Sequence, residues 1–270
     1  MRGWNWGCRA SERIVFMRNL ALLLGIFAAV SVNAQTASIT FQSSEAQTAL
    51  LELYTSEGCS SCPPAEAWLS RLKGAPGLWK DFVPLAFHVD YWDYLGWRDP
   101  WAAREFSDRQ RAYAERWRSE SVYTPGFALN GKEWRDWSGR KDAPKFSGAK
   151  GGVLTVSSSD TNRWQVSFTP TLAGGADYEV HAALLAGGLN SDVKSGENRG
   201  RRLSHDFVVL TVVKASLIRS GDKVQGSFDL PVRRKTPESS LALAVWITQA
   251  GRLEPLQATG GWLFRPAPGR

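Results

Sequence analysis

Glu57-Gly58-Cys59-Ser60-Ser61-Cys62-Pro63-Pro64 is the stretch that decides the fold expected for this chain. An apolar run precedes it at residues 49–54, and a segment with helical spacing follows it at residues 63–73. At the start of a helix, positions three residues apart lie about 5–6 Å apart, which is within reach of a disulfide. Unpaired amides and the helix dipole favour a thiolate there, so Cys59 is predicted to be the reactive and more exposed sulfur. The same pair is also compatible with half of a zinc site or with a structural staple.

The first 34 residues have the features of a secretory signal peptide. A short basic start, Met17-Arg18-Asn19, precedes an apolar run at residues 20–32, and Val32-Asn33-Ala34 resembles a cleavage site before Gln35. The run is shorter than the roughly 20 residues that a membrane-spanning helix needs, so an N-terminal anchor is the less favoured alternative. We therefore predict a periplasmic or secreted protein without stable membrane insertion after cleavage, and the sequence leaves open whether translation starts at Met1 or Met17.

Composition and charge narrow the functional class. The chain has 270 residues, 43% of them hydrophobic, which is enough to bury a core. Its formal net charge of +7 falls to +4 without residues 1–34, because 29 basic and 25 acidic residues remain. Such a small excess does not indicate nucleic-acid binding. Removal of Cys8 with this segment leaves Cys59 and Cys62 as the only cysteines, so no other disulfide framework is expected.

The chain up to residue 150 is expected to alternate strands and helices. A strand at residues 48–54, the helix from Pro63 and a strand at 82–90 form the βαβ unit of a parallel sheet. Asp99 and Pro100 are expected to cap and open a second helix.

The composition changes near residue 150, after a stretch rich in glycine, lysine, arginine and serine. Six short apolar or alternating runs without helical spacing predict an antiparallel sandwich. These runs are residues 153–156, 164–168, 178–185, 207–214, 224–230 and 241–248. The polar segment 186–206 is expected to be a surface excursion. We therefore predict three segments, with a signal peptide and N-terminal prefix at 1–34, an α/β domain at 35–150 and a β-rich domain at 151–270.

Thr124-Pro125 stands before a short strand at 127–129 and an Asn-Gly turn, where a cis bond is one solution for a strand-opening proline. Together with the CxxC pair, this arrangement resembles the thioredoxin-like superfamily, in which the cis threonine-proline bond sits against the CxxC and binds the substrate backbone. The resemblance implies an α/β fold for a thioredoxin-like domain that carries the CxxC site. The short strands after residue 150 predict that an antiparallel β-sandwich-like domain follows it.

Two positions differ from thioredoxin itself. Leu53 stands where thioredoxin has a buried aspartate, and the dipeptide between the cysteines is Ser60-Ser61. The redox poise of the thioredoxin CxxC pair therefore cannot be assumed for Cys59 and Cys62.

More narrowly, four stretches resemble the DUF1223 family of secreted bacterial proteins, which has no settled function. They are residues 54–64, His88-Val89-Asp90-Tyr91-Trp92-Asp93, residues 122–125 and Gly196-Glu197-Asn198-Arg199-Gly200-Arg201.

The function expected from these residues is thiol–disulfide exchange with protein thiols or disulfides in the periplasm. Cys59 would attack, and Cys62 would resolve the mixed disulfide. Thr124, Pro125 and Trp92 are the predicted substrate-binding residues. No cofactor or metal is expected to take part.

Carboxylates near the thiols are candidates for a proton relay. Glu52 and Asp90 are the predicted members, with Glu57 as a further candidate acid or base. For Glu52 the alternative is a salt bridge to a nearby arginine.

Two alternatives to exchange remain at this point. One is a soft-metal chaperone for copper, in which His88 joins the two cysteines as a ligand. The other is a binding module that retains the fold without catalysis. His181 and His205 are placed in the second domain, without ligand spacing. Trp97 and Trp101 are expected either to extend a substrate groove with Trp92 or to pack their loop onto the sheet.

Overall fold

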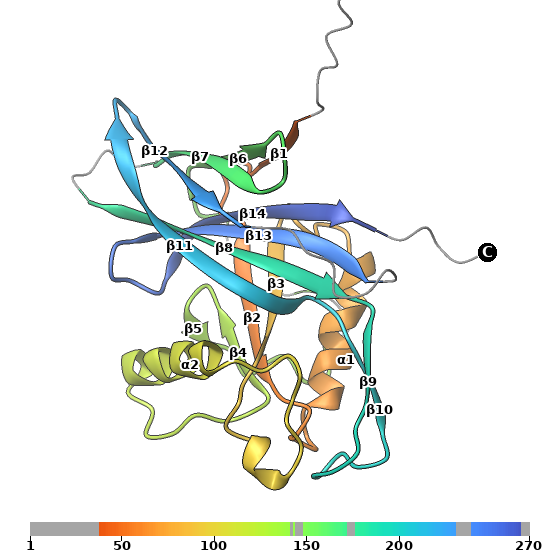
Figure 1. The fold of residues 1–270 in the computed structure, drawn as a ribbon. Helices are drawn as coiled ribbons and strands as arrows, with labels where there is room; N and C mark the ends of the chain where they lie inside the picture. The colour runs from red at the N-terminus through yellow and green to blue at the C-terminus, as the bar shows by residue number, and fades with distance from the viewer. Residues whose placement is uncertain (1–37, 141–142, 144–147, 172–175, 231–238, 266–270) are drawn as a thin grey trace, which may run out of the picture. The chain divides into compact units, whose positions relative to one another are not determined.

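The computed structural model describes residues 38–140, 143, 148–171, 176–230 and 239–265 (Figure 1). The predicted signal peptide and its cleavage point lie outside these residues. Residues Thr36–Arg270 form one compact unit. Neither α-helix of the described part has the length and apolar character needed to cross a membrane.

Strands outnumber helices in the described part of the chain. The first half contains β1 (Ile39–Gln42), β2 (Ala49–Thr55), α1 (Pro63–Arg71), β3 (Phe82–His88), α2 (Arg104–Trp117), β4 (Gly126–Leu129) and β5 (Lys132–Glu133). The second half contains β6 (Val153–Ser158), β7 (Arg163–Thr169), β8 (Tyr178–Gly187), β9 (Leu189–Asp192), β10 (Arg202–His205), β11 (Val208–Ser220), β12 (Lys223–Asp229), β13 (Ser240–Gln249) and β14 (Pro255–Phe264). All six strands expected after residue 150 are present, as β6, β7, β8, β11, β12 and β13.

One mixed sheet of twelve strands joins both halves of the chain. Its main order is β1-β6-β7-β12-β11-β3-β2-β4-β5, and β8, β13 and β14 branch from β11. Strand β11 has 13 residues, which is long enough to pair with three partners along its length. It runs parallel to β3 at Val208, antiparallel to β8 along most of its length, and antiparallel to β12 at its end.

The predicted fold class is therefore wrong. A thioredoxin-like α/β domain followed by a separate β-sandwich-like domain was expected, but the fold is mostly β and one sheet includes strands from both segments. The physical reason lies in β8 and β13, whose side chains are buried on both faces. Ala183 and Ala244 pack into the same core as β2, β3 and α2, whereas Leu184 and Leu243 pack into the core beneath β6, β7 and β12. The expected boundary near residue 150 lies inside the compact unit.

The two α-helices cover opposite faces of β2 and β3, because successive side chains of a strand point to opposite faces. Leu51 and Leu53 pack against α1, and Leu50 and Tyr54 pack in the core that includes α2. Helix α2 begins at Arg104, not at residue 100 as predicted. Asp99 does not cap this helix, since its carboxylate accepts hydrogen bonds from His88 and from backbone amides before the helix starts.

His181 on β8 is expected to make stability depend on pH. Its ring stacks on Trp246 at 5.3 Å, and burial, followed by the positive charge of Arg109, lowers the pKa of His181 to about 4. Glu179 opposes this shift and Lys214 adds to it. In the unfolded chain this histidine titrates near pH 6.5. The unfolded state therefore binds more protons than the folded state below that pH. The contribution of neutral His181 to the free energy of unfolding is complete above pH 6.5 and is lost as the pH falls toward 4. His181→Phe keeps the stacking and should flatten this fall in the free energy of unfolding, measured by urea denaturation between pH 4 and 7. An unchanged slope would contradict the assignment.

Candidate functional site

Cys59 and Cys62 form a disulfide across the turn before α1. Their Cα atoms lie 5.5 Å apart, within the range that the sequence spacing predicts. Cys62 occupies the N-cap position of α1, and Pro63-Pro64 fill the first helical positions, where a missing amide donor leaves no bond unmade. Cys59 is 1% exposed and Cys62 is fully buried. Cys59 was predicted to be the more exposed of the two, but both cysteines are buried and their exposures differ by only 1%.

The loop between β9 and β10 covers this turn. The Asn198 side-chain amide donates to the carbonyls of Glu57 and Cys59, at 2.8 and 2.9 Å. Glu197 accepts a hydrogen bond from the Ser60 amide at 2.9 Å. Arg201 donates to the Asn198 side-chain oxygen at 2.7 Å. Segment 186–206 was expected to be a surface excursion, and it has many exposed residues, but its Asn198 side chain is fully buried against the CxxC turn.

Two features that can interact with a charged sulfur lie close to Cys59. The Ser61 hydroxyl lies 3.4 Å from Cys59 Sγ and is placed to donate to it. The pair also precedes the N-terminus of α1, where the helix dipole favours an anion.

The predicted substrate-binding residues lie together beside the same turn. The Thr124–Pro125 bond is cis, which confirms the prediction. Trp92 Nε1 donates to Thr124 Oγ1 at 2.7 Å. Trp92 also packs on Gly58, where an added Cβ would lie 2.9 Å from the Cβ of Trp92. Trp92 therefore connects the CxxC turn to the threonine-proline bond, and only glycine leaves room for it.

The two predicted relay carboxylates point toward α2. Glu52 is fully buried and forms two hydrogen bonds with Arg109, at 2.7 and 3.0 Å. The Tyr113 hydroxyl also donates to Glu52, at 2.6 Å. Asp90 accepts from the hydroxyl of Ser107 on α2. Glu52 therefore forms a salt bridge with an arginine, which was the alternative to its predicted role in a proton relay.

A buried network of charged side chains lies next to the CxxC turn instead. His205 at the end of β10 contacts Glu66 of α1 through Nδ1 and Glu57 through Nε2, the latter at 2.9 Å. Trp97 Nε1 donates to the other oxygen of Glu57 at 2.7 Å, and the Thr55 hydroxyl donates to Glu66 at 2.5 Å. Trp97 therefore packs its loop onto the network.

The charges of this network are opposite and paired. Burial lowers the pKa of His205, but Glu66 and Glu57 outweigh it and raise the pKa to about 10. Burial raises the pKa of Glu66, yet the positive charge and hydrogen bond of His205 leave that pKa below its usual value. His205 was placed in a different domain from these glutamates and without ligand spacing, yet it contacts both of them. No local spacing links residues so far apart in the sequence.

His88 and Asp99 form a second buried pair beside the network. His88 Nδ1 lies 2.7 Å from Asp99 Oδ2, and Asp99 also accepts from the amides of Glu57 and Trp101. Burial raises the pKa of Asp99, but His88 and these hydrogen bonds bring it below its ordinary value. His88 Nε2 is buried and has no hydrogen-bond partner among the described residues.

One group among the described residues has the geometry to hold a metal ion. It consists of Glu66, His88 and His205, whose potential ligand atoms all lie within 4.8 Å of one another. Neither Cys59 nor Cys62 belongs to it, so the copper-chaperone alternative built on these cysteines gains no support.

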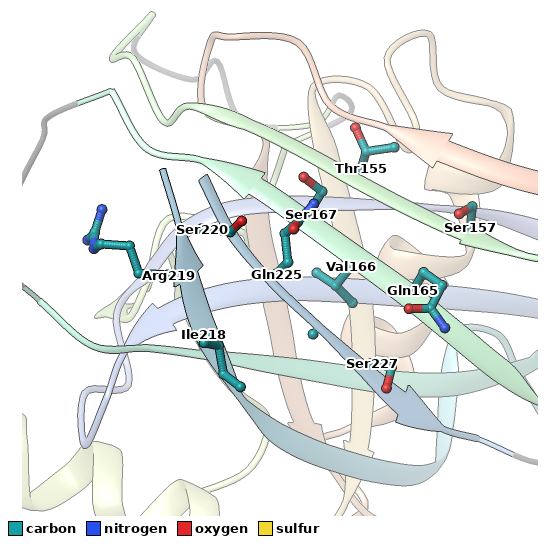
Figure 2. A pocket seen from close by; sticks show the side chains of 11 residues that line it. Thr155, Ser157, Gln165, Val166, Ser167, Ile218, Arg219, Ser220, Gln225 and Ser227 are labelled. Carbon is teal, nitrogen blue, oxygen red and sulfur yellow. The ribbon is translucent and has the colours of Figure 1, made fainter. Parts of the chain in front are cut away.

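Surface hollows of the described residues include one beside the predicted substrate-binding residues and one away from them. A cavity of about 290 Å³ adjoins Pro125 and is lined by Tyr123, Pro125, Phe127, Trp134, Arg135 and Trp137. A groove of about 590 Å³ lies over β6, β7, β11 and β12, and Figure 2 shows its hydroxyl and amide side chains. The first adjoins the cis bond, whereas the second has no lining residue in common with the CxxC site.

Comparisons with known proteins agree with this fold. The family model described as "Protein of unknown function (DUF1223)" matches residues 50–248. A crystal structure of protein AGR_C_4864 from Agrobacterium tumefaciens has 26% sequence identity and a TM-score of 0.55, covering 84% of this chain and 98% of that one. HBP35 of Porphyromonas gingivalis has 12% identity and a TM-score of 0.53, covering 84% and 79%. No curated protein matches the chain.

Proposed function

The chain belongs to the DUF1223 family, and for this member we propose thiol–disulfide exchange with protein thiols or disulfides outside the cytoplasm. The observation that carries the proposal is the closed Cys59–Cys62 disulfide at the start of α1, beside the Trp92–Thr124 hydrogen bond. The disulfide and the signal-peptide features of residues 17–34 support a periplasmic or secreted location.

In the reduced protein, the Cys59 thiolate attacks a disulfide of the partner and displaces one partner thiolate. Cys62 then attacks Sγ of Cys59, which closes the Cys59–Cys62 disulfide and releases the second partner thiol. Ser61 stabilises the Cys59 thiolate by donating its hydroxyl hydrogen. The aromatic cavity next to Pro125 is placed to hold an extended partner segment. Exchange in the opposite direction uses the same mixed disulfide.

A static disulfide that only staples the turn is the second candidate, and the burial of both cysteines favours it. A binding module would then use the same surface without covalent chemistry. The two functions differ in whether a mixed disulfide ever forms.

Trapping separates these candidates. Cys62→Ser should accumulate mixed disulfides with periplasmic proteins, because attack by Cys59 continues while resolution stops. Cys59→Ser is the matched control and should trap few partners or none. The measurement is non-reducing electrophoresis followed by mass spectrometry. If Cys62→Ser traps no partner while it remains folded, the disulfide is a staple and the exchange proposal fails.

A further inference from the structure

Three buried side chains from distant parts of the chain meet below the CxxC turn. Glu66 comes from α1, His88 ends β3 and His205 ends β10. Their potential ligand atoms lie within 4.8 Å of one another, and the two imidazole rings meet edge to face with centroids 5.1 Å apart. Burying two imidazoles and a carboxylate together is costly unless each polar atom is satisfied.

One nitrogen of each imidazole forms a hydrogen bond with a carboxylate outside the group of three. Asp99 binds His88 at Nδ1, and Glu57 binds His205 at Nε2. A carboxylate on the non-ligating nitrogen is the support that metal-binding histidines usually have, because it fixes the ring orientation. The nitrogens that would face a ligand are His88 Nε2, which has no partner among the described residues, and His205 Nδ1, which contacts Glu66.

His88 Nε2 is an independent indication of a missing partner. The side chain is fully buried, and this nitrogen has no hydrogen-bond partner among the described residues. Nearly all buried polar atoms have a partner, so an unpaired one beside a second imidazole and a carboxylate points to a bound species.

We propose that Glu66, His88 and His205 bind a zinc ion. Two imidazole nitrogens and one carboxylate oxygen are a donor set that zinc uses with a fourth position left open. The ion would take the place of the proton on His205, since a ligating imidazole is neutral. The site contains no sulfur ligand, so it is independent of the state of the cysteines and of the exchange proposed above.

The test is metal binding to the full-length oxidised protein. After equilibrium dialysis against zinc, metal analysis should find one ion per chain, and cobalt in the same site should give the visible absorption of a low-symmetry complex. His88→Ala should lose this stoichiometric binding. His181→Phe is the matched control, because it replaces a buried histidine outside the cluster and should bind zinc as the unmodified protein does. Asp99→Asn keeps all three ligands and should weaken binding about 10–100-fold.

Three results would overturn the proposal. The first is the absence of stoichiometric zinc in the unmodified protein. The second is unchanged binding in a folded His88→Ala variant or, if that variant does not fold, in Asp99→Asn. The third is zinc binding that appears only after the Cys59–Cys62 disulfide is reduced, which would assign the ion to the thiolates.

Discussion

The Arg109→Met variant is expected to lose about 3–5 kcal/mol of unfolding free energy, because it leaves a buried carboxylate without its counter-ion. Arg109 forms two hydrogen bonds with Glu52, and Glu52 is fully buried between the sheet and α2. Methionine preserves much of the side-chain volume, so the loss reports the missing charge more than a cavity. Urea denaturation at neutral pH measures it.

Two controls make this result specific. Arg111 lies on the same helix with its ion pair to Asp108 exposed to solvent, so Arg111→Met should cost about 1 kcal/mol or less. Glu52→Gln combined with Arg109→Met removes both charges and should recover part of the stability. Equal costs for Arg109→Met and Arg111→Met would show that the buried pair does not stabilise the fold.

The second large effect is expected at Asn198, which covers the disulfide. Asn198→Ala removes two hydrogen bonds to the carbonyls of Glu57 and Cys59. The Cys59 carbonyl keeps a hydrogen bond from the Cys62 amide, but the Glu57 carbonyl loses its partner. Leaving a buried carbonyl unpaired costs about 1–3 kcal/mol, and each 1.4 kcal/mol corresponds to about a factor of ten. The Cys59–Cys62 disulfide should therefore be reduced by dithiothreitol roughly tenfold faster or more, as followed by alkylation of the released thiols.

Asn190 provides the matched control for this measurement. It lies on β9 in the same hairpin, but it is exposed and bonds only within the hairpin. Asn190→Ala should leave the reduction rate unchanged. If Asn198→Ala is reduced no faster than the unmodified protein, the loop does not control access to the sulfur atoms.

The local features of the site were predictable from the sequence. Spacing of three residues at a helix start brings the two cysteines within disulfide range, and the proline pair marks where α1 begins. The threonine-proline bond is cis, which was expected as one solution for a proline that opens a strand. Each of these depends on backbone geometry within a few residues, which is why a sequence pattern is enough to reveal it.

The arrangement of the sheet and the chemistry around the disulfide were decided only by the tertiary structure. Alternating apolar residues predicted strands β8, β11 and β13, but this periodicity does not reveal which strands pair. Strand β11 pairs with β3, and this pairing joins the strands of the two expected domains into one sheet. That same pairing brings His205, just before β11, to Glu57 and Glu66, more than 130 residues away in sequence. It also brings Asn198 over Cys59. Burial and charge partners of this kind come from contacts between distant segments, and these depend on how all the strands and helices pack together.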